Sequence, residues 1–208
     1  SIESRTNHDV KAVEYFLKEK FKLNKNLAPY TEFIHFACTS EDINNLAYAL
    51  MIKDASLITK KSLKLITNRV KFLSKKYSNN PMLSRTHGQK ASPTTFGKEL
   101  KVFSSRLKKQ FAFMEKRLVY AKINGAVGNF NAHHMVLPEI KWDVETKNFL
   151  SNLGLKQNTH TTQIENHDWL SEALNDISMI STILLDFSKD IWIYIMLDYI
   201  KQKKINSE

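Results

Sequence analysis

One long stretch without glycine or proline constrains the fold of this 208-residue chain most strongly. It runs from Ser40 to Tyr77, and it begins with Thr39, Ser40 and two acidic residues, which is a strong helix start. A helix of about 37 residues would span roughly 55 Å, a length typical of the rods in helix bundles. The whole chain has only five glycines and four prolines. The sequence therefore predicts an all-α protein built as a bundle of long helices.

Hydrophobic periodicity predicts two further long helices and two shorter ones. Ser92 as N-cap and Pro93 at the first position would open one long helix, whose apolar residues recur every three or four positions: Phe96, Leu100, Phe103, Leu107, Phe111, Met114, Leu118 and Ala121. The other starts near Asp168, and its stripe is Leu170, Leu174, Ile177, Ile180, Leu184, Phe187, Ile191 and Ile195. The shorter helices cover Asp9 to Phe21 and Trp142 to Leu153.

The segment from Trp192 to Ile200 is apolar almost all round. Asp186, Lys189 and Asp190 interrupt the apolar run before it, which disfavours a membrane span and favours burial among several helices. If one domain cannot cover this surface, an oligomer can. We therefore predict a protein with no membrane segment that buries this helix by self-association.

The net charge of +10 raises the question of a nucleic-acid partner. On the longest helix, Lys60, Lys64, Lys71 and Lys75 fall on the side opposite its apolar stripe, which is Leu63, Ile66, Val70, Leu73 and Tyr77. Few of these lysines are interleaved with aromatic residues, as a single-strand binder would require. This pattern favours a solvated face, and we predict no nucleic-acid partner.

Cysteine and histidine usage bears on compartment and metal binding. The single Cys38 cannot form an internal disulfide, and no signal-peptide pattern is present, so we expect a cytoplasmic protein. The adjacent His133 and His134 would point in different directions, and the chain has no HExxH motif and no cysteine cluster. We therefore predict no metal site.

Polar stretches at the predicted helix ends are the candidate functional segments. The run Ser84 to Gln89 lies between turn and breaker residues and contains His87. Histidine is the side chain best suited to acid-base chemistry at physiological pH. The run Thr6-Asn7-His8 precedes a helix, where it could bind an anion, or Thr6 or Asn7 could simply cap the helix. Asn124 to Asn129 contains two glycines that would let the backbone approach another segment closely, without the spacing of a dinucleotide loop.

Five segments together resemble the adenylosuccinate lyase family in its bacterial form, within the fumarase and aspartase superfamily. They are Thr6 to Phe16, Cys38 to Asn45, Ser84 to Gln89, Lys122 to Asn129 and Thr161 to Glu165. The resemblance implies a long-helix fold whose central helices form a homotetramer core. It implies release of fumarate from adenylosuccinate, giving AMP, and from the succinylaminoimidazole carboxamide ribotide, without a cofactor. A basic protein would suit these substrates, which carry a phosphate and two carboxylates.

The resemblance also assigns residues to roles. His87 matches the general acid that protonates the departing nitrogen. Asn7, His8 and Asp9 match a substrate-binding run, Thr39 and Ser40 match the pair that holds the succinyl carboxylate, and Gln163 matches a substrate-contacting glutamine. For Lys122, Asn124 and Glu165 the resemblance implies only proximity to the site.

The match has two departures. Lys90 follows Gln89 where the family usually has proline, which adds a charge near His87. The family's catalytic base is a serine on a loop reading roughly GSSxMPHKxNP, and Lys203 to Glu208 resembles the run that leads to it. Residues 1–208 are thus expected to form the central helical domain, without the small N-terminal domain and the signature loop, and to lack lyase activity by themselves.

Other assignments remain open from the sequence. Argininosuccinate lyase, aspartase and fumarase share the superfamily fold and the elimination chemistry. The chain could instead serve only as a helical oligomerisation module. A basic helical protein that binds nucleic acid is a third possibility, which salt-dependent binding would reveal.

Overall fold

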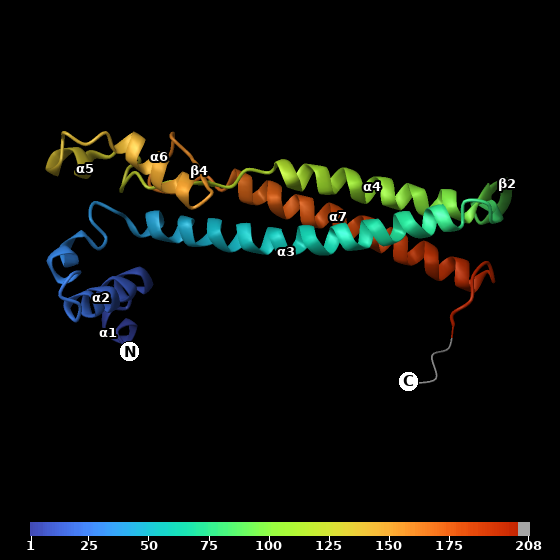
Figure 1. Cartoon of the computed structure of the whole chain (residues 1–208), viewed down its shortest axis with the longest axis horizontal. Coiled ribbons are helices and arrows are strands. Elements are labelled where there is room, and N and C mark those ends of the chain that lie inside the picture. The colour runs from blue at the N-terminus through green and yellow to red at the C-terminus, as the bar shows by residue number, and fades with distance from the viewer. Residues whose placement is uncertain (204–208) are drawn as a thin grey trace. The chain divides into compact units, whose positions relative to one another are not determined.

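The computed structural model describes residues 1–203, and its contacts divide the chain into two compact units. The first unit comprises Ser1–Asp54 and Leu118–Trp169, and the second comprises Ala55–Arg117 and Leu170–Glu208. Two long helices, α3 (Ser40–Lys76) and α7 (Asp168–Met196), contribute residues to both units. The predicted long-helix fold is confirmed (Figure 1).

The first unit combines short helices with the start of α3. Its elements are α1 (Glu3–Thr6), α2 (Asp9–Lys22), η1 (Ala28–Phe33), β3 (Tyr120–Ala121), α5 (Asn131–Val136), α6 (Trp142–Asn152) and β4 (Lys156–Gln157). β3 and β4 pair in parallel, with Tyr120 opposite Lys156. α2 and α6 agree with the predicted helices to within a residue or two.

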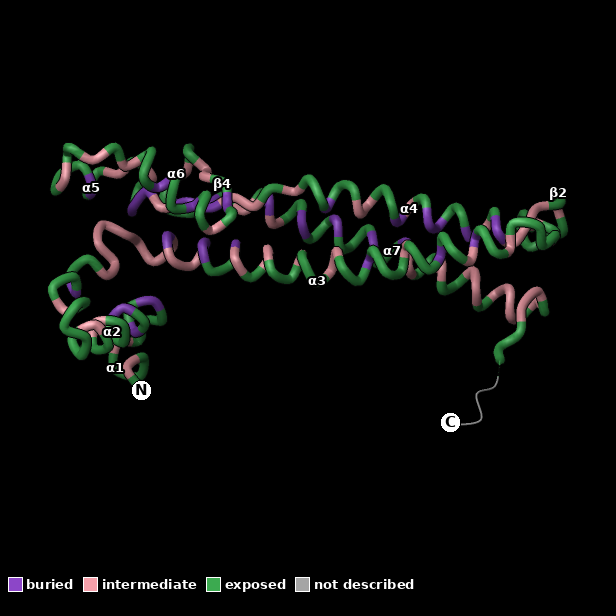
Figure 2. The backbone as a smooth tube through the Cα atoms, viewed as in Figure 1, coloured by how far each residue is buried: buried purple, intermediate pink, exposed green. Residues whose placement is uncertain are grey.

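The second unit is a three-helix rod with a hairpin. It contains the later part of α3, β1 (Pro81–Thr86), β2 (Gln89–Thr95), α4 (Phe96–Lys116) and nearly all of α7. Figure 2 shows the buried positions of these helices on the sides that face one another. The buried core of the rod is Leu63, Val70, Leu100, Phe103, Leu107, Met114, Ile180 and Ile183. Most of the predicted stripe residues therefore lie in the core or pack against it.

Some predicted stripe residues lie elsewhere. Ile66, Leu174 and Ile177 are exposed, as is Leu118, which follows the end of α4. Ala121 is fully buried, but it belongs to β3 and not to the helix that we expected to reach it. The helix α7 ends at Met196, so the apolar segment predicted to continue as helix to Ile200 turns before its end.

The start of α4 corrects a second expectation. Ser92 and Pro93 do not open the helix, because they belong to β2, where Pro93 lies opposite Leu83. The N-cap is Thr95, whose side chain accepts a hydrogen bond from the backbone N–H of Lys98 at 3.1 Å. Proline is tolerated in this two-stranded hairpin because the strand has a free edge.

No helix of residues 1–203 is both long enough and apolar enough to cross a membrane. The cytoplasmic location expected from the single cysteine stays a prediction. The run predicted to lead toward a signature loop falls mostly on residues 204–208, outside the described part of the chain.

Candidate functional site

The start of α3 is fixed by a carboxylate from its own first turn. Asp42 accepts a hydrogen bond at Oδ2 from the backbone N–H of Thr39 at 2.8 Å. Thr39 therefore stands in the position before the helix, and the side chain three residues later satisfies its N–H, as in the returning half of a capping box. Because Asp42 is fully buried, this contact also ties the helix start to the interior of the first unit.

The partner of that carboxylate is a lysine from a distant part of the chain. Lys122 is fully buried, and its Nζ lies 2.9 Å from Asp42 Oδ1. The same ammonium group donates to the carbonyl oxygens of Gly125 at 2.9 Å and Gln163 at 2.8 Å. Asn45 holds the lysine backbone from the other side, since its amide group accepts from Lys122 N–H at 2.9 Å and donates to Lys122 carbonyl oxygen at 3.0 Å.

The glycine-containing run after Lys122 brings another loop close. Gly128 has a φ of +81°, and a Cβ on it would meet the carbonyl oxygen of Thr161 at 2.1 Å. Asn124 donates from Nδ2 to the hydroxyl of Thr161 at 2.9 Å, and its backbone N–H donates to Asp42 at 3.2 Å. The close approach predicted from the glycines is therefore an approach to the loop that carries Gln163.

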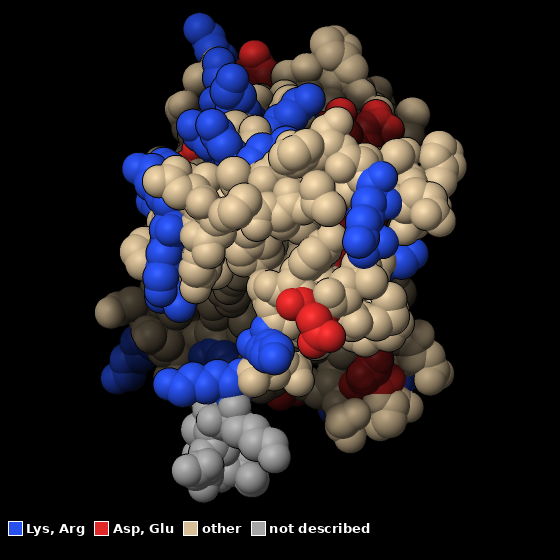
Figure 3. All heavy atoms as spheres, turned by 90° about the vertical axis from the view of Figure 1, so that its right-hand side faces the viewer, with Lys and Arg blue, Asp and Glu red and all other residues tan. Residues whose placement is uncertain are grey.

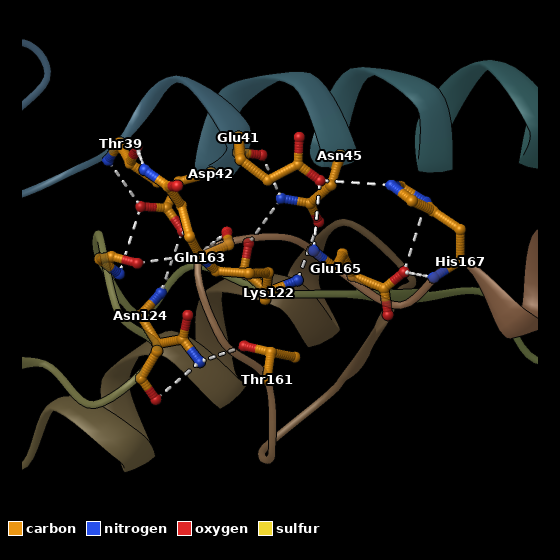
Figure 4. A network of polar contacts seen from close by, with 12 residues as sticks. Thr39, Glu41, Asp42, Asn45, Lys122, Asn124, Thr161, Gln163, Glu165 and His167 are labelled. Atoms are coloured by element: carbon orange, nitrogen blue, oxygen red, sulfur yellow. Dashed lines mark hydrogen bonds and ion pairs between the residues drawn. The ribbon is translucent and has the colours of Figure 1, made fainter.

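Gln163 and Thr39 meet through their side chains. Gln163 Nε2 donates to Thr39 Oγ1 at 3.4 Å, although the two residues are 124 positions apart in the chain. Figure 4 shows both residues beside the Lys122 and Asp42 pair. Two residues that the sequence assigned to substrate binding thus lie in contact, with amide and hydroxyl groups that can turn toward a carboxylate.

A second carboxylate cluster lies next to this contact. Glu165 is almost fully buried and accepts hydrogen bonds from Asn158 Nδ2 at 2.8 Å and Trp169 Nε1 at 3.2 Å. His167, in the left-handed backbone region at a φ of 59°, contacts both Glu165 and Glu41, with Nε2 3.2 Å from Glu41. The predicted proximity of Lys122, Asn124 and Glu165 to the substrate-binding candidates is therefore present in this unit.

The N-terminal candidates lie at the start of α2. His8 is the N-cap, not Thr6 or Asn7, because its Nδ1 accepts a hydrogen bond from Lys11 N–H at 3.3 Å. In the neutral ring this contact places the proton on Nε2, which lies 3.4 Å from the hydroxyl of Ser40. Nε2–H can therefore donate to an anion beside Ser40.

Asn7 and Asp9 flank this histidine. Asn7 ends α1 in the left-handed region at a φ of 49°. Asp9 accepts from Val10 N–H at 2.7 Å and is otherwise exposed. His8, Ser40, Thr39 and Gln163 thus form one line of polar side chains along the start of α3.

His87 belongs to the second unit. With Gly88 it forms the two-residue turn of the β1–β2 hairpin, at φ values of 52° and 74°. Its Nδ1 lies 3.1 Å from the hydroxyl of Thr86, and the residue is exposed. The loop predicted for Ser84 to Gln89 is therefore a hairpin, and it presents the imidazole at its tip.

The net positive charge of the chain comes entirely from the second unit. That unit has 20 Lys and Arg against 8 Asp and Glu, a net charge of +12, whereas the first unit has 11 against 13, a net charge of −2. Six lysines line a groove of about 700 Å³ along α3 and α4: Lys64, Lys71, Lys75, Lys98, Lys101 and Lys108. In Figure 3, Lys and Arg side chains outnumber Asp and Glu on the visible face. Thr39 and Gln163 therefore lie in the unit that has a slightly negative net charge.

Two other titratable groups in the first unit, Cys38 and His133, are held neutral by burial. Burial raises the pKa of the Cys38 thiol to about 11, with a further contribution from the Asp42 carboxylate. Burial lowers the pKa of His133, whose ring packs against Trp142 and Phe36. At neutral pH the Cys38 side chain is therefore a thiol and not the nucleophilic thiolate. In residues 1–203, no cluster of three or more His, Cys, Asp or Glu could hold a metal ion.

Sequence reasoning gave Asp42, Asn45, Glu41 and His167 no role, although the first three lie inside a motif that carried the resemblance. A signal was available in the helix periodicity. Asp42 and Asn45 occupy the same side of α3 as the buried Leu46 and Ala49. Polar residues on a buried helix side require internal partners, and the sequence alone does not say which ones.

Comparison with families and curated proteins gives consistent results. A family model described as "Lyase" matches residues 1–208. Over 208 residues the chain is 52% identical to the adenylosuccinate lyase of Legionella pneumophila (strain Corby), and over 209 residues it is 47% identical to that of Escherichia coli (strain K12). Each alignment covers 100% of the chain and 46% of the relative, so the chain spans about half the length of these proteins.

Comparison with solved structures agrees on the fold. The 3-carboxy-cis,cis-muconate lactonizing enzyme from Pseudomonas putida matches with a TM-score of 0.78 at 18% identity, over 93% of this chain and 43% of that one. A fumarate lyase from Mesorhizobium sp. BNC1 matches with a TM-score of 0.65 at 20% identity, over 79% and 38% of the two chains. At these identities the likeness concerns the fold alone.

Proposed function

The chain belongs to the lyase family, and from this premise we propose that it is the central helical part of an adenylosuccinate lyase. In this proposal the intact protein releases fumarate from adenylosuccinate, which leaves AMP, and from the related succinylaminoimidazole carboxamide ribotide. The alignments with adenylosuccinate lyases, at 52% and 47% identity over the whole chain, support this substrate assignment.

The reaction sets clear demands on the site. A proton leaves the carbon beside a carboxylate, the neighbouring carbon–nitrogen bond breaks, and the electron pair of the C–H bond becomes the second bond of fumarate. The departing nitrogen takes up a proton from an acid, and the enzyme must stabilise negative charge that develops on the carboxylate. The site therefore needs hydrogen-bond donors at the carboxylate and an acid near the nitrogen.

The contact between Thr39 and Gln163 is the observation that carries the proposal for substrate binding. The hydroxyl and amide groups at 3.4 Å, with Ser40 and His8 Nε2 beside them, supply several donors at one helix start. The partial positive charge of a helix N-terminus favours an anion at this place. We assign Thr39, Ser40 and Gln163 to the succinyl carboxylate, and Asn7, His8 and Asp9 to the rest of the substrate.

His87 is our candidate for the general acid. The hairpin tip exposes its imidazole, and the contact with Thr86 limits the rotation of the ring. We place His87 opposite the leaving nitrogen of a substrate bound to the assembled protein. As the family resemblance implies, we propose that the complete site draws loops from several associated copies of the chain.

We further propose that the protein is a homotetramer whose core includes α7. The part of α7 in the second unit exposes large apolar side chains, namely Leu174, Met179, Leu185, Trp192 and Met196. Burying such a surface is favourable, and a monomer leaves it in water. Light scattering after size exclusion should give four times the mass of one chain, and the mass of a single chain would contradict this part of the proposal.

The activity test is an assay of the intact protein as its gene encodes it. AMP and fumarate formed from adenylosuccinate are quantified, with argininosuccinate, aspartate and malate as the competing substrates. Turnover of adenylosuccinate alone is expected. Turnover of argininosuccinate, aspartate or malate would assign the protein to a different lyase, and a folded protein that turns over none of the four substrates would favour a purely structural role.

The role of His87 is tested separately by His87→Ala. We expect turnover to fall by roughly 100- to 10,000-fold with folding retained, because an acid contributes about this much to an elimination. His134→Ala is the matched control, since His134 is also exposed and has no assigned role. Near-normal turnover of His87→Ala would remove His87 from the mechanism.

A further inference from the structure

We propose that the buried pair of Lys122 and Asp42 is the positioning element that sets the distance between Thr39 and Gln163. The inference rests on the proposed function in so far as those two residues bind substrate. It concerns residues that the sequence left without a role or placed only near the site.

Lys122 has no hydrogen-bonding capacity left for a substrate. An ammonium group has three N–H donors, and they are directed to Asp42, the Gly125 carbonyl oxygen and the Gln163 carbonyl oxygen, all within 2.9 Å. The side chain is also fully buried. Lys122 is therefore a positioning residue and not a catalytic one.

Asp42 is saturated in the same way. Oδ1 receives Lys122 Nζ at 2.9 Å and Asn124 N–H at 3.2 Å, while Oδ2 receives Thr39 N–H at 2.8 Å and Gly125 N–H at 3.2 Å. A carboxylate has about four acceptor sites, so all of them are engaged. One carboxylate thus joins the start of α3 to the loop that follows Lys122.

Each substrate-binding candidate is one hydrogen bond away from this pair. Thr39 is attached through its backbone N–H to Asp42, and Gln163 through its carbonyl oxygen to Lys122. Their direct side-chain contact is a single long hydrogen bond between exposed groups, which by itself fixes little. The ion pair therefore determines where the two donor groups stand relative to each other.

Stability alone does not account for a charged pair at this place. Desolvation of two buried charges offsets most of their attraction, and apolar residues of similar volume would serve folding as well. The pair instead accepts from three backbone N–H groups and donates to two carbonyl oxygens in fixed directions, which apolar residues cannot do. This directional bonding is what a carboxylate-binding site requires.

The test uses the intact protein with Lys122→Met, which keeps the length of the side chain and removes its donors. Lys53→Met is the matched control, because Lys53 also donates to a carbonyl oxygen in the first unit, that of Leu153, without touching the site. Amide hydrogen exchange reports on the N–H groups of Thr39, Asn124 and Gly125. We expect Lys122→Met to lose protection at these amides while the control keeps it.

Kinetics supply the second readout. We expect kcat/KM for adenylosuccinate to fall on the order of 100-fold in Lys122→Met, with a raised KM, because misplacement of binding groups by about 1 Å has effects of this size. A loss of folded protein alone would lower the apparent kcat and leave KM unchanged. Exchange protection and kcat/KM equal to those of Lys53→Met would overturn the proposal.

Asp42→Asn covers the case in which Lys122→Met does not fold. It keeps the side-chain shape and one oxygen for Lys122, but an NH₂ group then faces backbone N–H donors. Loss of protection at Thr39 and Gly125 together with a raised KM is expected, and unchanged values would overturn the proposal. If protection is lost while the wild-type intact protein shows no lyase activity, the proposed function fails and the positioning role stands.

Discussion

Each of the two units of the chain is stabilised internally by a different kind of interaction. The rod of the second unit has an apolar interior in which Leu63, Leu100, Leu107 and Ile183 are at most 2% exposed. The first unit also buries Leu150 and Leu155, at most 2% exposed, but it buries five polar residues as deeply, namely Asp42, Asn45, Lys122, Asn124 and Glu165, at most 3% exposed. We call these five residues the buried polar network.

This difference indicates which unit can hold its side chains and loops in defined orientations. Apolar contacts are non-directional, so a rod tolerates changes in its side chains as long as volume is kept. Hydrogen bonds and ion pairs have preferred geometry, so a polar network holds each loop at one place. The substrate-binding candidates of the first unit accordingly lie on the polar network, and the hairpin with His87 lies at the end of an apolar rod.

The largest expected effect is on the buried ion pair. Lys122→Met leaves Asp42 buried without its counter-charge, and we expect the free energy of unfolding of the intact protein to fall by about 3–5 kcal/mol. The double variant Lys122→Met with Asp42→Asn should lose less than the sum of the two single losses, since neither charge is then left alone. Urea unfolding measures all four proteins, and strictly additive losses would show that the two side chains do not interact.

A core substitution in the rod should cost somewhat less. Leu107 is fully buried between α4 and its neighbouring helices, and Leu107→Ala should lower the free energy of unfolding by about 3 kcal/mol. Leu107→Met should cost about 1 kcal/mol or less, because volume is nearly kept. Amide exchange near Thr39 should be unchanged in both variants, and lost protection there would break the contrast between the two units.

The rods could be predicted from the sequence because their signals are local. α3 was predicted to run from Ser40 to about Tyr77 and runs to Lys76, since capping residues and an absence of breakers fixed its ends. The β1–β2 hairpin was not predicted. Ser92 and Pro93 resemble a helix start in sequence, but the N-cap is Thr95, whose hydroxyl accepts a hydrogen bond from the backbone N–H of Lys98.

Part of the candidate site could be predicted from the resemblance to a known family, and not from the hydrophobic pattern of the sequence. The motifs drew attention to Thr39, Gln163 and His8, and these lie along one helix start. The bonds that hold them could not be predicted from a single sequence, because Asp42 and Lys122 are 80 positions apart and the burial expected for Asp42 does not identify its partner. The short pairing of β3 with β4 escaped prediction for the same reason.

A smaller effect is expected from the buried imidazole of the first unit. Burial lowers the pKa of His133 below its ordinary value of 6.5, with the neighbouring His134 acting in the same direction and Asp42 against it. The unfolded chain therefore binds more protons as the pH falls through 6.5, and stability must fall with it. Between about pH 7 and 5, the free energy of unfolding of the intact protein should drop more than that of His133→Phe. An identical pH dependence in both proteins would contradict this assignment, and His134→Phe serves as the control.

The smallest expected effect is a pH dependence of stability in the second unit, where stability should decrease as the pH rises. Burial raises the pKa of Asp190, as do the charges of Asp186 and Glu99, while Lys189 and Arg106 oppose the shift. The folded protein therefore holds this proton above pH 3.8, where the unfolded chain has released it, so stability declines as the pH rises through the raised pKa.

Asp190→Asn removes this penalty, and its gain in the free energy of unfolding should be present at pH 7 and vanish toward pH 3. Asp186→Asn is the comparison, because Asp186 also loses an ion pair with Arg106 at 3.0 Å and should gain less. A variant Asp190→Asn that is less stable than the parent at pH 7 would mean that this carboxylate is paired within the assembled protein. The apolar rod would then rely on directional contacts as the first unit does.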